Sequence, residues 1–295
     1  MSELLLYPMG EIRAMIKFTK MHGNGNDYIY INAIEQAVKN PAKLAFEMSH
    51  RHYGVGSDGL ILIMESKIPG VDFRMRIFNS DGSEAEMCGN GIRCFAKYVY
   101  ERGLHVSREL SIETLSGVKA LKLNIKNRKI VSVTVDMGEP IILRGQIPMI
   151  GKEGTVINES LHLLDGTHFD ITALSMGNPH AVIFVEDTGN FPVEKYGPMI
   201  ENHDLFPQRT NVAFVQVLNK KEILQRTWER GSGETMACGT GASAATVASI
   251  LTGQTERALT VHLKGGDLEV SWKEKNGHVY MTGPAVDVFD GEWGA

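Results

Sequence analysis

Short segments of alternating or continuous apolar residues dominate the chain and predict many short β-strands. The clearest lie at residues 60–65, 73–77, 118–125, 131–136, 212–218, 223–228, 268–272 and 279–283. Two segments have helical character instead, residues 90–102 and 242–252, and each stops at a glycine, Gly103 and Gly253. Glycine is a common signal for the end of a helix. The pattern therefore predicts an α+β protein that is rich in strands.

The second predicted helix has no charged face, and an apolar helix this short belongs inside a protein. Strands are the elements available to cover it, so we expect two β-rich units, each enclosing one helix. The length of 295 residues suits two domains, and the loop-like Gly138-Glu139-Pro140 indicates that they meet near residues 130–140. We expect a leader at 1–15 with no assigned function, a first domain at 16–132 and a second at 133–283.

The same turn, Cys-Gly-x-Gly, precedes both helices, at Cys88 and at Cys238, with a spacing of 150 residues. A strand-like segment also comes before each cysteine. This internal repeat predicts two similar halves related by a pseudo-two-fold axis, which would direct both helix N-termini into one cleft.

The turns suggest acid–base chemistry. Unpaired N–H groups at a helix N-terminus favour anions, so each thiolate is expected to be stabilised and each thiol pKa lowered, and a substrate carboxylate could bind the same amides. Inverting a stereocentre needs a base on one face of the carbon and an acid on the other, which two opposed thiols supply. The alternative is that the glycines only turn the chain and the cysteines only pack. Cys94 lacks such a turn and is expected to be a core filler.

Composition narrows the class of partner. The formal net charge is -5 with no dense Lys/Arg block, which argues against nucleic acid or an anionic membrane surface. The three cysteines form no CxxC pair that would suggest zinc. The first residues are too short and acidic for a signal peptide or a membrane span. A small-molecule partner and a cytoplasmic location are therefore expected.

Several motifs, taken in order, resemble the diaminopimelate epimerase family from about Ile16 onward. They are Met21-His22-Gly23-Asn24-Gly25-Asn26-Asp27, Gly56-Ser57-Asp58-Gly59, Phe78-Asn79-Ser80-Asp81-Gly82-Ser83, Cys88-Gly89-Asn90-Gly91, Met176-Gly177-Asn178-Pro179-His180, Thr210-Asn211-Val212, Glu229-Arg230-Gly231 and Cys238-Gly239-Thr240-Gly241. The resemblance implies interconversion of LL- and meso-diaminopimelate without cofactor or metal, in lysine and peptidoglycan precursor biosynthesis. It also implies two mixed β-barrels, each around a central helix, with residues 284–295 returning to the first domain.

The resemblance also implies the site. Cys88 and Cys238 would be the acid/base pair, with His180 and Glu229 tuning their ionisation. The implied substrate contacts are Asn26, Asn79, Asn178, Asn211, Glu229, Arg230 and the backbone amides of Gly89, Asn90, Gly239 and Thr240. Arg230 is suited to clamp the distal carboxylate of the substrate. This chain has Gly59 where many members have a glutamine contact, and the family's dimer, with an aromatic near Phe289, is a further implication.

Other functions fit part of the pattern. A proline or hydroxyproline racemase of the same fold also uses two cysteines, but Arg230 and the asparagines, suited to a distal amino-acid group, disfavour it. A thiol redox protein would need the two cysteines to cycle through a disulfide. A catalytically inactive binding protein that keeps the cleft would not need both cysteines.

Overall fold

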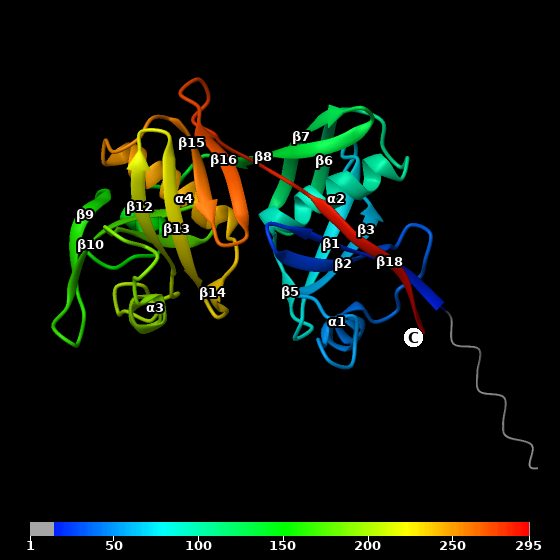
Figure 1. Ribbon diagram of the computed structural model, residues 1–295, viewed down its shortest axis with the longest axis horizontal. Helices are drawn as coiled ribbons and strands as arrows, with labels where there is room; N and C mark the ends of the chain where they lie inside the picture. Colours follow the sequence, from blue (N-terminus) through cyan, green and yellow to red (C-terminus); the bar gives the residue numbers. More distant parts are fainter. Residues whose placement is uncertain (1–14, 295) are drawn as a thin grey trace, which may run out of the picture.

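A computed structural model describes residues 15–294, so residues 1–14 of the predicted leader, and residue 295, lie outside the described part. Within it the chain forms eighteen strands and four α-helices (Figure 1), which confirms the α+β prediction. The first half contains β1 (Met15–Gly23), β2 (Asn26–Asn32), α1 (Pro41–Ser49), β3 (Gly59–Glu65), β4 (Phe73–Asn79), β5 (Glu84–Ala85), α2 (Gly89–Glu101), β6 (Glu109–Thr114), β7 (Gly117–Lys126) and β8 (Lys129–Gly138).

The second half follows after a short 3₁₀ turn, Arg144–Gln146. It contains β9 (Val156–His162), β10 (His168–Ser175), β11 (Pro179–Phe184), α3 (Val193–Glu201), β12 (Asn211–Asn219), β13 (Glu222–Glu229), β14 (Gly233–Thr235), α4 (Gly239–Leu251), β15 (Ala258–Leu263), β16 (Gly266–Trp272), β17 (Val279–Gly283) and β18 (Val286–Gly294). All eight strand segments expected from the sequence are present.

The two halves share one order of strand pairing. In the first, β2 and β3 pair in parallel across α1, and β4 and β6 pair in parallel across α2. In the second, β11 and β12 pair in parallel across α3, and β13 and β15 across α4. The remaining neighbours in both halves are antiparallel, joined by short turns. The repeat around the cysteines thus extends to strand topology.

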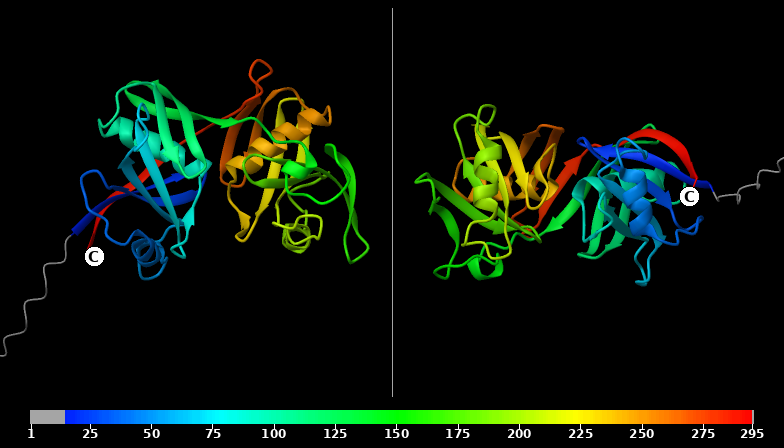
Figure 2. Two further views of the ribbon diagram at one scale, coloured as in Figure 1. Left: turned by 180° about the vertical axis from the view of Figure 1, so that it is seen from behind. Right: turned by 90° about the horizontal axis from the view of Figure 1, so that it is seen from below.

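Two connections join the halves. β8 pairs with β7 on one side and with β17 on the other, so the sheet is continuous, and the expected boundary between residues 132 and 133 falls inside β8. β18 then crosses to the first half and pairs along β1, from Val286 opposite His22 to Gly294 opposite Met15. Figures 1 and 2 show the two lobes, with the strands of each lobe curling around its own helix, α2 or α4.

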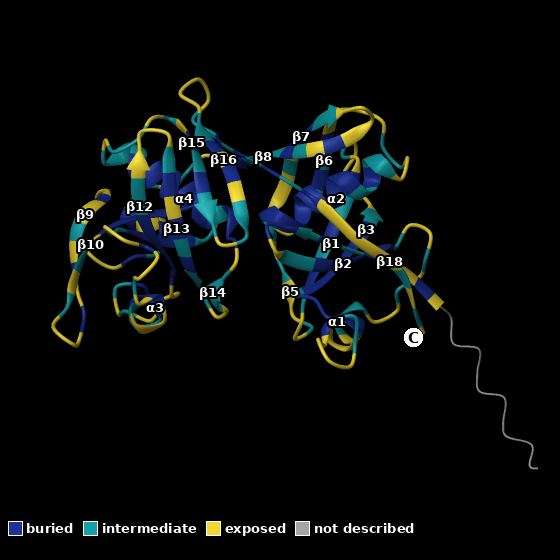
Figure 3. Ribbon diagram, viewed as in Figure 1, coloured by how far each residue is buried: buried dark blue, intermediate teal, exposed yellow. Residues whose placement is uncertain are grey.

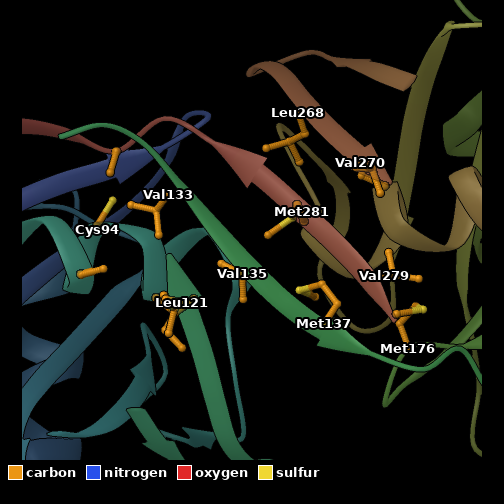
Figure 4. Close-up of a cluster of buried hydrophobic side chains, with 14 of the residues drawn as sticks. Cys94, Leu121, Val133, Val135, Met137, Met176, Leu268, Val270, Val279 and Met281 are labelled. Atoms are coloured by element: carbon orange, nitrogen blue, oxygen red, sulfur yellow. The ribbon is translucent and has the colours of Figure 1, made fainter. Parts of the chain in front are cut away.

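The core surrounds these two helices. Figure 3 colours most of α2 and α4 as buried, and every residue of α4 from Gly241 to Ser249 is buried. Figure 4 shows side chains of β8, β16 and β17 packed together where the lobes join, with Cys94 in the same apolar cluster. Cys94 is 0% exposed, which confirms its expected place in the core.

The predicted ends of the two central helices agree with the structure more closely than their predicted starts. Gly103 and Gly253 adopt φ of +75° and +70°, the left-handed conformation that terminates a helix. α4 begins at Gly239, earlier than the predicted residue 242, because the Gly-x-Gly segment itself forms the first helical turn. The nine-residue helices α1 and α3 were not predicted, and α3 contains Pro198.

Candidate active site

Cys88 and Cys238 cap the two central helices. Each residue has extended backbone and occupies the N-cap position, of α2 and of α4 respectively. The Cys88 Sγ accepts a hydrogen bond from the Gly91 N–H at 3.3 Å, and the Cys238 Sγ accepts one from the Gly241 N–H at 3.4 Å. Both sulfurs therefore face the positive end of a helix dipole, as expected from the turns.

The two helix N-termini also lie against each other. A β-carbon added to Gly89 would lie 3.7 Å from the Gly239 Cα, and one added to Gly239 would lie 3.6 Å from the Gly89 Cα. Any side chain at Gly239 would also meet the Met281 Sδ at 2.9 Å. Glycine at these positions thus permits the two Cys-Gly-x-Gly turns to pack together.

Amide and phenol groups surround Cys88, which is half-buried. Its Sγ lies 3.3 Å from the Asn26 Oδ1, and the Asn90 Nδ2 donates to the same oxygen at 3.4 Å. The Asn90 Nδ2 also donates to the Ala237 carbonyl, next to Cys238, at 2.9 Å. Asn90 therefore connects the surroundings of one cysteine with the chain next to the other.

A carboxylate side chain lies next to Cys238, which is only 4% exposed. The Glu229 side chain lies beside it and accepts a 2.6 Å hydrogen bond from the Thr235 Oγ1. The Thr240 Oγ1 is 3.5 Å from the Cys238 Sγ. The two thiols thus have different neighbours, a neutral amide on one side and an acidic group on the other.

The expected lowering of the thiol pKa values is wrong in this structure. Burial raises the pKa of Cys88, and the hydrogen bond from the Gly91 amide offsets this rise only in part. Burial raises the pKa of Cys238 well above its usual value, and the Glu229 charge adds to the rise. The helix N-terminus acts in the expected direction, but loss of solvent around the sulfur outweighs it.

His180 and Asn178 form a pair in the second half. The His180 Nε2 lies 3.0 Å from the Asn178 Oδ1, while the buried Nδ1 has no hydrogen-bond partner among residues 15–294. Burial, with a smaller contribution from the charge of Arg230, lowers the pKa of His180 to about 3. His180 is therefore a neutral imidazole near neutral pH.

Arg230 and Asn211 are joined through the backbone. The Asn211 Oδ1 accepts from the Arg230 N–H at 3.0 Å, and the Asn211 Nδ2 donates to the Pro179 carbonyl at 2.9 Å. Asn211 also pairs with His180 across β11 and β12. The Arg230 guanidinium donates from Nη1 to the Gln208 carbonyl at 2.9 Å. This bond uses one of the five N–H donors of the guanidinium.

The structure thus gathers most of the predicted residues into three groups, and the two groups around the cysteines contact each other. Asn26, Gly89 and Asn90 lie around Cys88, and Glu229, Gly239 and Thr240 lie around Cys238, with Asn178, His180, Asn211 and Arg230 connected to one another. Asn79 stands apart from these contacts, since its Nδ2 donates to the Ser83 Oγ at 3.0 Å. At Gly59 an added β-carbon would lie 2.2 Å from the Phe78 carbonyl oxygen, so this backbone position accepts no side chain.

Two residues of these surroundings, Tyr28 beside Cys88 and Asp58 beside Asn26, were not selected from the sequence. The Tyr28 hydroxyl lies close enough to the Cys88 sulfur that the two groups perturb each other's pKa. Asp58 accepts from the Asn26 Nδ2 at 2.7 Å and pairs with Arg51 at 2.7 Å. Asp58 stands in a quoted motif, which was the available signal, whereas nothing in the pattern separates Tyr28 from a core strand residue.

Thiol reactivity should reflect these pKa values. We expect the rate of alkylation by iodoacetamide to keep rising above the ordinary thiol pKa of about 8.5, with Cys88 reacting before the more buried Cys238. Peptide mapping by mass spectrometry across a pH series measures both rates. Cys94, buried with a pKa of about 11, is the internal reference. Rates that already level off at neutral pH would contradict the raised values.

Neither a metal cluster nor a membrane helix is found in the described part. No group of three or more His, Cys, Asp or Glu side chains within residues 15–294 is placed to hold a metal ion. Over the same residues, no helix has the length and apolar character needed to span a membrane.

Solved structures first define the class of fold. A hydroxyproline epimerase from Agrobacterium vitis superposes with a TM-score of 0.68 at 14% identity, covering 94% of this chain and 92% of its own. A PhzF-family phenazine biosynthesis protein from Bacillus anthracis gives 0.66 at 18%, covering 95% and 99%. At these identities the likeness establishes the fold alone, and it is the fold that those two proteins share.

Sequence comparison then gives the family. A family model described as diaminopimelate epimerase matches residues 18–143 and 172–288. Diaminopimelate epimerases from Acetivibrio thermocellus and Methanococcus maripaludis are 54% and 52% identical, each over 94% of this chain and over 98% and 99% of their own length. This chain belongs to the diaminopimelate epimerase family.

Proposed function

We propose that this chain interconverts LL- and meso-diaminopimelate by two-base proton transfer, with Cys88 and Cys238 as the acid and the base. The observation that carries this proposal is the packing of the two Cys-Gly-x-Gly turns against each other. The diaminopimelate epimerases that cover nearly the whole chain support the choice of substrate. Lysine and peptidoglycan precursor biosynthesis, in the cytoplasm, is the corresponding role.

The mechanism moves one proton onto and one proton off the substrate. One cysteine, as thiolate, removes the α-proton and becomes a thiol, and the opposite thiol delivers its own proton to the other face of the carbon. The product leaves with the opposite configuration, and the two sulfurs have exchanged protonation states. The reverse reaction uses the same groups with their roles exchanged.

The same geometry lowers the barrier to carbanion formation. Two helix N-termini lie together, so the amides of Gly89, Asn90, Gly239 and Thr240 can hold the α-carboxylate, where negative charge develops. The raised thiol pKa values make each thiolate a stronger base toward a weakly acidic C–H group. Glu229, beside Cys238, favours the protonated form of that thiol and so keeps an acid available.

The distal end of diaminopimelate needs a carboxylate clamp and carbonyl acceptors for its ammonium. Arg230 supplies a fork of donors, and Asn178 and Asn211 supply amide oxygens. Asn79, which lies apart from these three residues, would approach the substrate from the first half. The neutral His180 holds the Asn178 side chain through its Nε2. These contacts distinguish the substrate from proline or hydroxyproline, which have no distal amino-acid group.

We also propose the larger organisation expected from the sequence. Residues 16–132, with 284–295, would form one domain and residues 133–283 the other, related by a pseudo-two-fold axis. A homodimer through β18 is supported by the exposure of Val288 and Phe289 on this strand, which pairs only with β1 among the described strands. Sedimentation of the wild type and of Phe289→Asp tests it, and a wild type that sediments as a monomer would contradict it.

The direct test is turnover of purified protein on LL-diaminopimelate and, in parallel, on L-proline and trans-4-hydroxy-L-proline. We expect meso-diaminopimelate from the first and no isomerisation of the other two. Free thiols titrated during turnover should stay constant in number. Isomerisation of the imino acids alone, or thiols that cycle through a disulfide, would favour the racemase or the redox protein instead.

A further inference from the structure

Arg93 is a buried cation whose side chain donates hydrogen bonds to uncharged oxygen atoms in the described part of the chain. It lies on the first turns of α2, five residues after Cys88, and its side chain is 0% exposed. Its four hydrogen bonds to oxygen within residues 15–294 are accepted by backbone carbonyls and asparagine side chains, none of them a carboxylate. A buried charge without a counter-charge is costly, so a stabilising role alone does not explain an arginine here.

Two glycines make the slot for its guanidinium. A β-carbon added to Gly23, at the end of β1, would lie 3.0 Å from the Arg93 Nη2. One added to Gly283, at the end of β17, would lie 3.0 Å from the Arg93 Cζ. The slot therefore lies between a strand of the first half and a strand of the second, and it admits a planar group only because both positions lack side chains.

One set of bonds from Arg93 ties the two halves together. Its Nη2 donates to the Asn24 Oδ1 at 2.5 Å, and the Asn24 Nδ2 donates in turn to the Asp267 carbonyl in the second half at 3.1 Å. Its Nε donates to the Pro284 carbonyl, where the chain leaves β17 for β18, at 3.1 Å.

A second set reaches the cysteines. The Arg93 Nη1 donates to the Asn90 Oδ1 at 3.1 Å and to the Gly89 carbonyl at 3.0 Å. With its oxygen held in this way, Asn90 directs its Nδ2 to the Ala237 carbonyl beside Cys238 and to the Asn26 Oδ1 beside Cys88. The orientation of one amide, set by Arg93, thus connects both cysteine turns.

We propose that Arg93 is a positioning residue for the epimerase reaction: its guanidinium holds the N-terminal turns of α2 and α4 together and thereby fixes Asn90, Asn26 and the Cys88 sulfur. The inference rests on the proposed function. It assigns to the arginine a task that lysine cannot perform, because an ammonium has three donors and cannot satisfy four acceptors.

The first test compares Arg93→Ala with and without added guanidinium. Loss of the fork should lower kcat/KM for diaminopimelate by about 10²-fold, the scale expected for a misplaced reacting group. Millimolar guanidinium chloride, far below denaturing concentrations, should restore at least part of it, whereas methylammonium should not. Arg108→Ala, which removes an exposed arginine, should keep wild-type kcat/KM with no response to guanidinium. A folded Arg93→Ala with wild-type kcat/KM, or one whose loss guanidinium does not relieve, would overturn the proposal.

A second variant covers the case in which Arg93→Ala does not fold. Asn24 has a left-handed backbone with φ of +53°, which glycine adopts freely, so Asn24→Gly removes the amide link without strain. We expect normal folding, with KM raised about tenfold and kcat nearly unchanged, because substrate binding must now also bring the halves together. Wild-type KM and kcat in this variant would contradict the role of the link.

Thiol alkylation separates failure of this inference from failure of the proposed function. Wild-type protein that does not act on diaminopimelate would refute the proposed reaction. The positioning role would then be tested by the alkylation rate of Cys88 alone. In Asn24→Gly, and in folded Arg93→Ala, Cys88 should react with iodoacetamide several times faster than in the wild type. An unchanged rate in both variants would reject the positioning role whatever the substrate.

Discussion

Replacing Cys238 with alanine should lower kcat/KM for diaminopimelate by about 10³-fold or more, within the range that positioned acid–base groups contribute. The loss is expected in both directions, since each direction needs one thiolate and one thiol. Cys88→Ala should behave in the same way. Epimerisation rates from LL- and from meso-diaminopimelate, measured for both variants, check the prediction.

Cys94→Ala is the matched control. Cys94 is fully buried in the core cluster and caps neither helix, so its loss should cost some stability and leave kcat/KM close to that of the wild type. If Cys94→Ala fell as far as Cys238→Ala while remaining folded, the distinction between the three thiols would be wrong.

Arg230→Lys should lower kcat/KM about 10- to 100-fold, since lysine keeps the charge but loses one of two parallel bonds to the distal carboxylate. Most of the loss should appear as a higher KM, because the clamp binds substrate and transition state alike. Steady-state kinetics with diaminopimelate measures it. Arg108→Lys, at an exposed position, is the control and should be neutral. A near-wild-type kcat/KM for Arg230→Lys would remove Arg230 from the substrate site.

The repeated elements were predictable because they depend on local patterns. The strands that precede each cysteine, the Cys-Gly-x-Gly turns and the helix-ending glycines all follow from neighbouring residues, and the structure contains each of them. The pairing of β18 with β1 joins the two ends of the described chain, and only the family resemblance indicated it. α1 and α3 were missed because nine residues give too little periodicity to separate them from loops.

The site was predictable in residue type and less so in electrostatics. The helix N-terminus suggested lowered thiol pKa values, whereas burial of both sulfurs raises them, and burial depends on residues distant in sequence. Arg93 lay within the helix expected at residues 90–102 but in none of the quoted motifs, because its importance arises from acceptors such as Asn24 and Pro284 on other segments. Tyr28 was missed for the same reason. In the sequence it is an aromatic residue of a strand, and its contact with Cys88 joins distant segments.

Solvent isotope incorporation tests the two-cysteine mechanism most directly. In heavy water the thiolate that removes the α-proton becomes a thiol carrying protium, while the opposite thiol, equilibrated with solvent, delivers deuterium to the other face. From LL-diaminopimelate, over the first few per cent of reaction, mass spectrometry and NMR of both isomers should therefore find deuterium in the product and none in recovered substrate. Deuterium that enters recovered substrate as fast as product would indicate one exchanging base and contradict the assignment of Cys88 and Cys238.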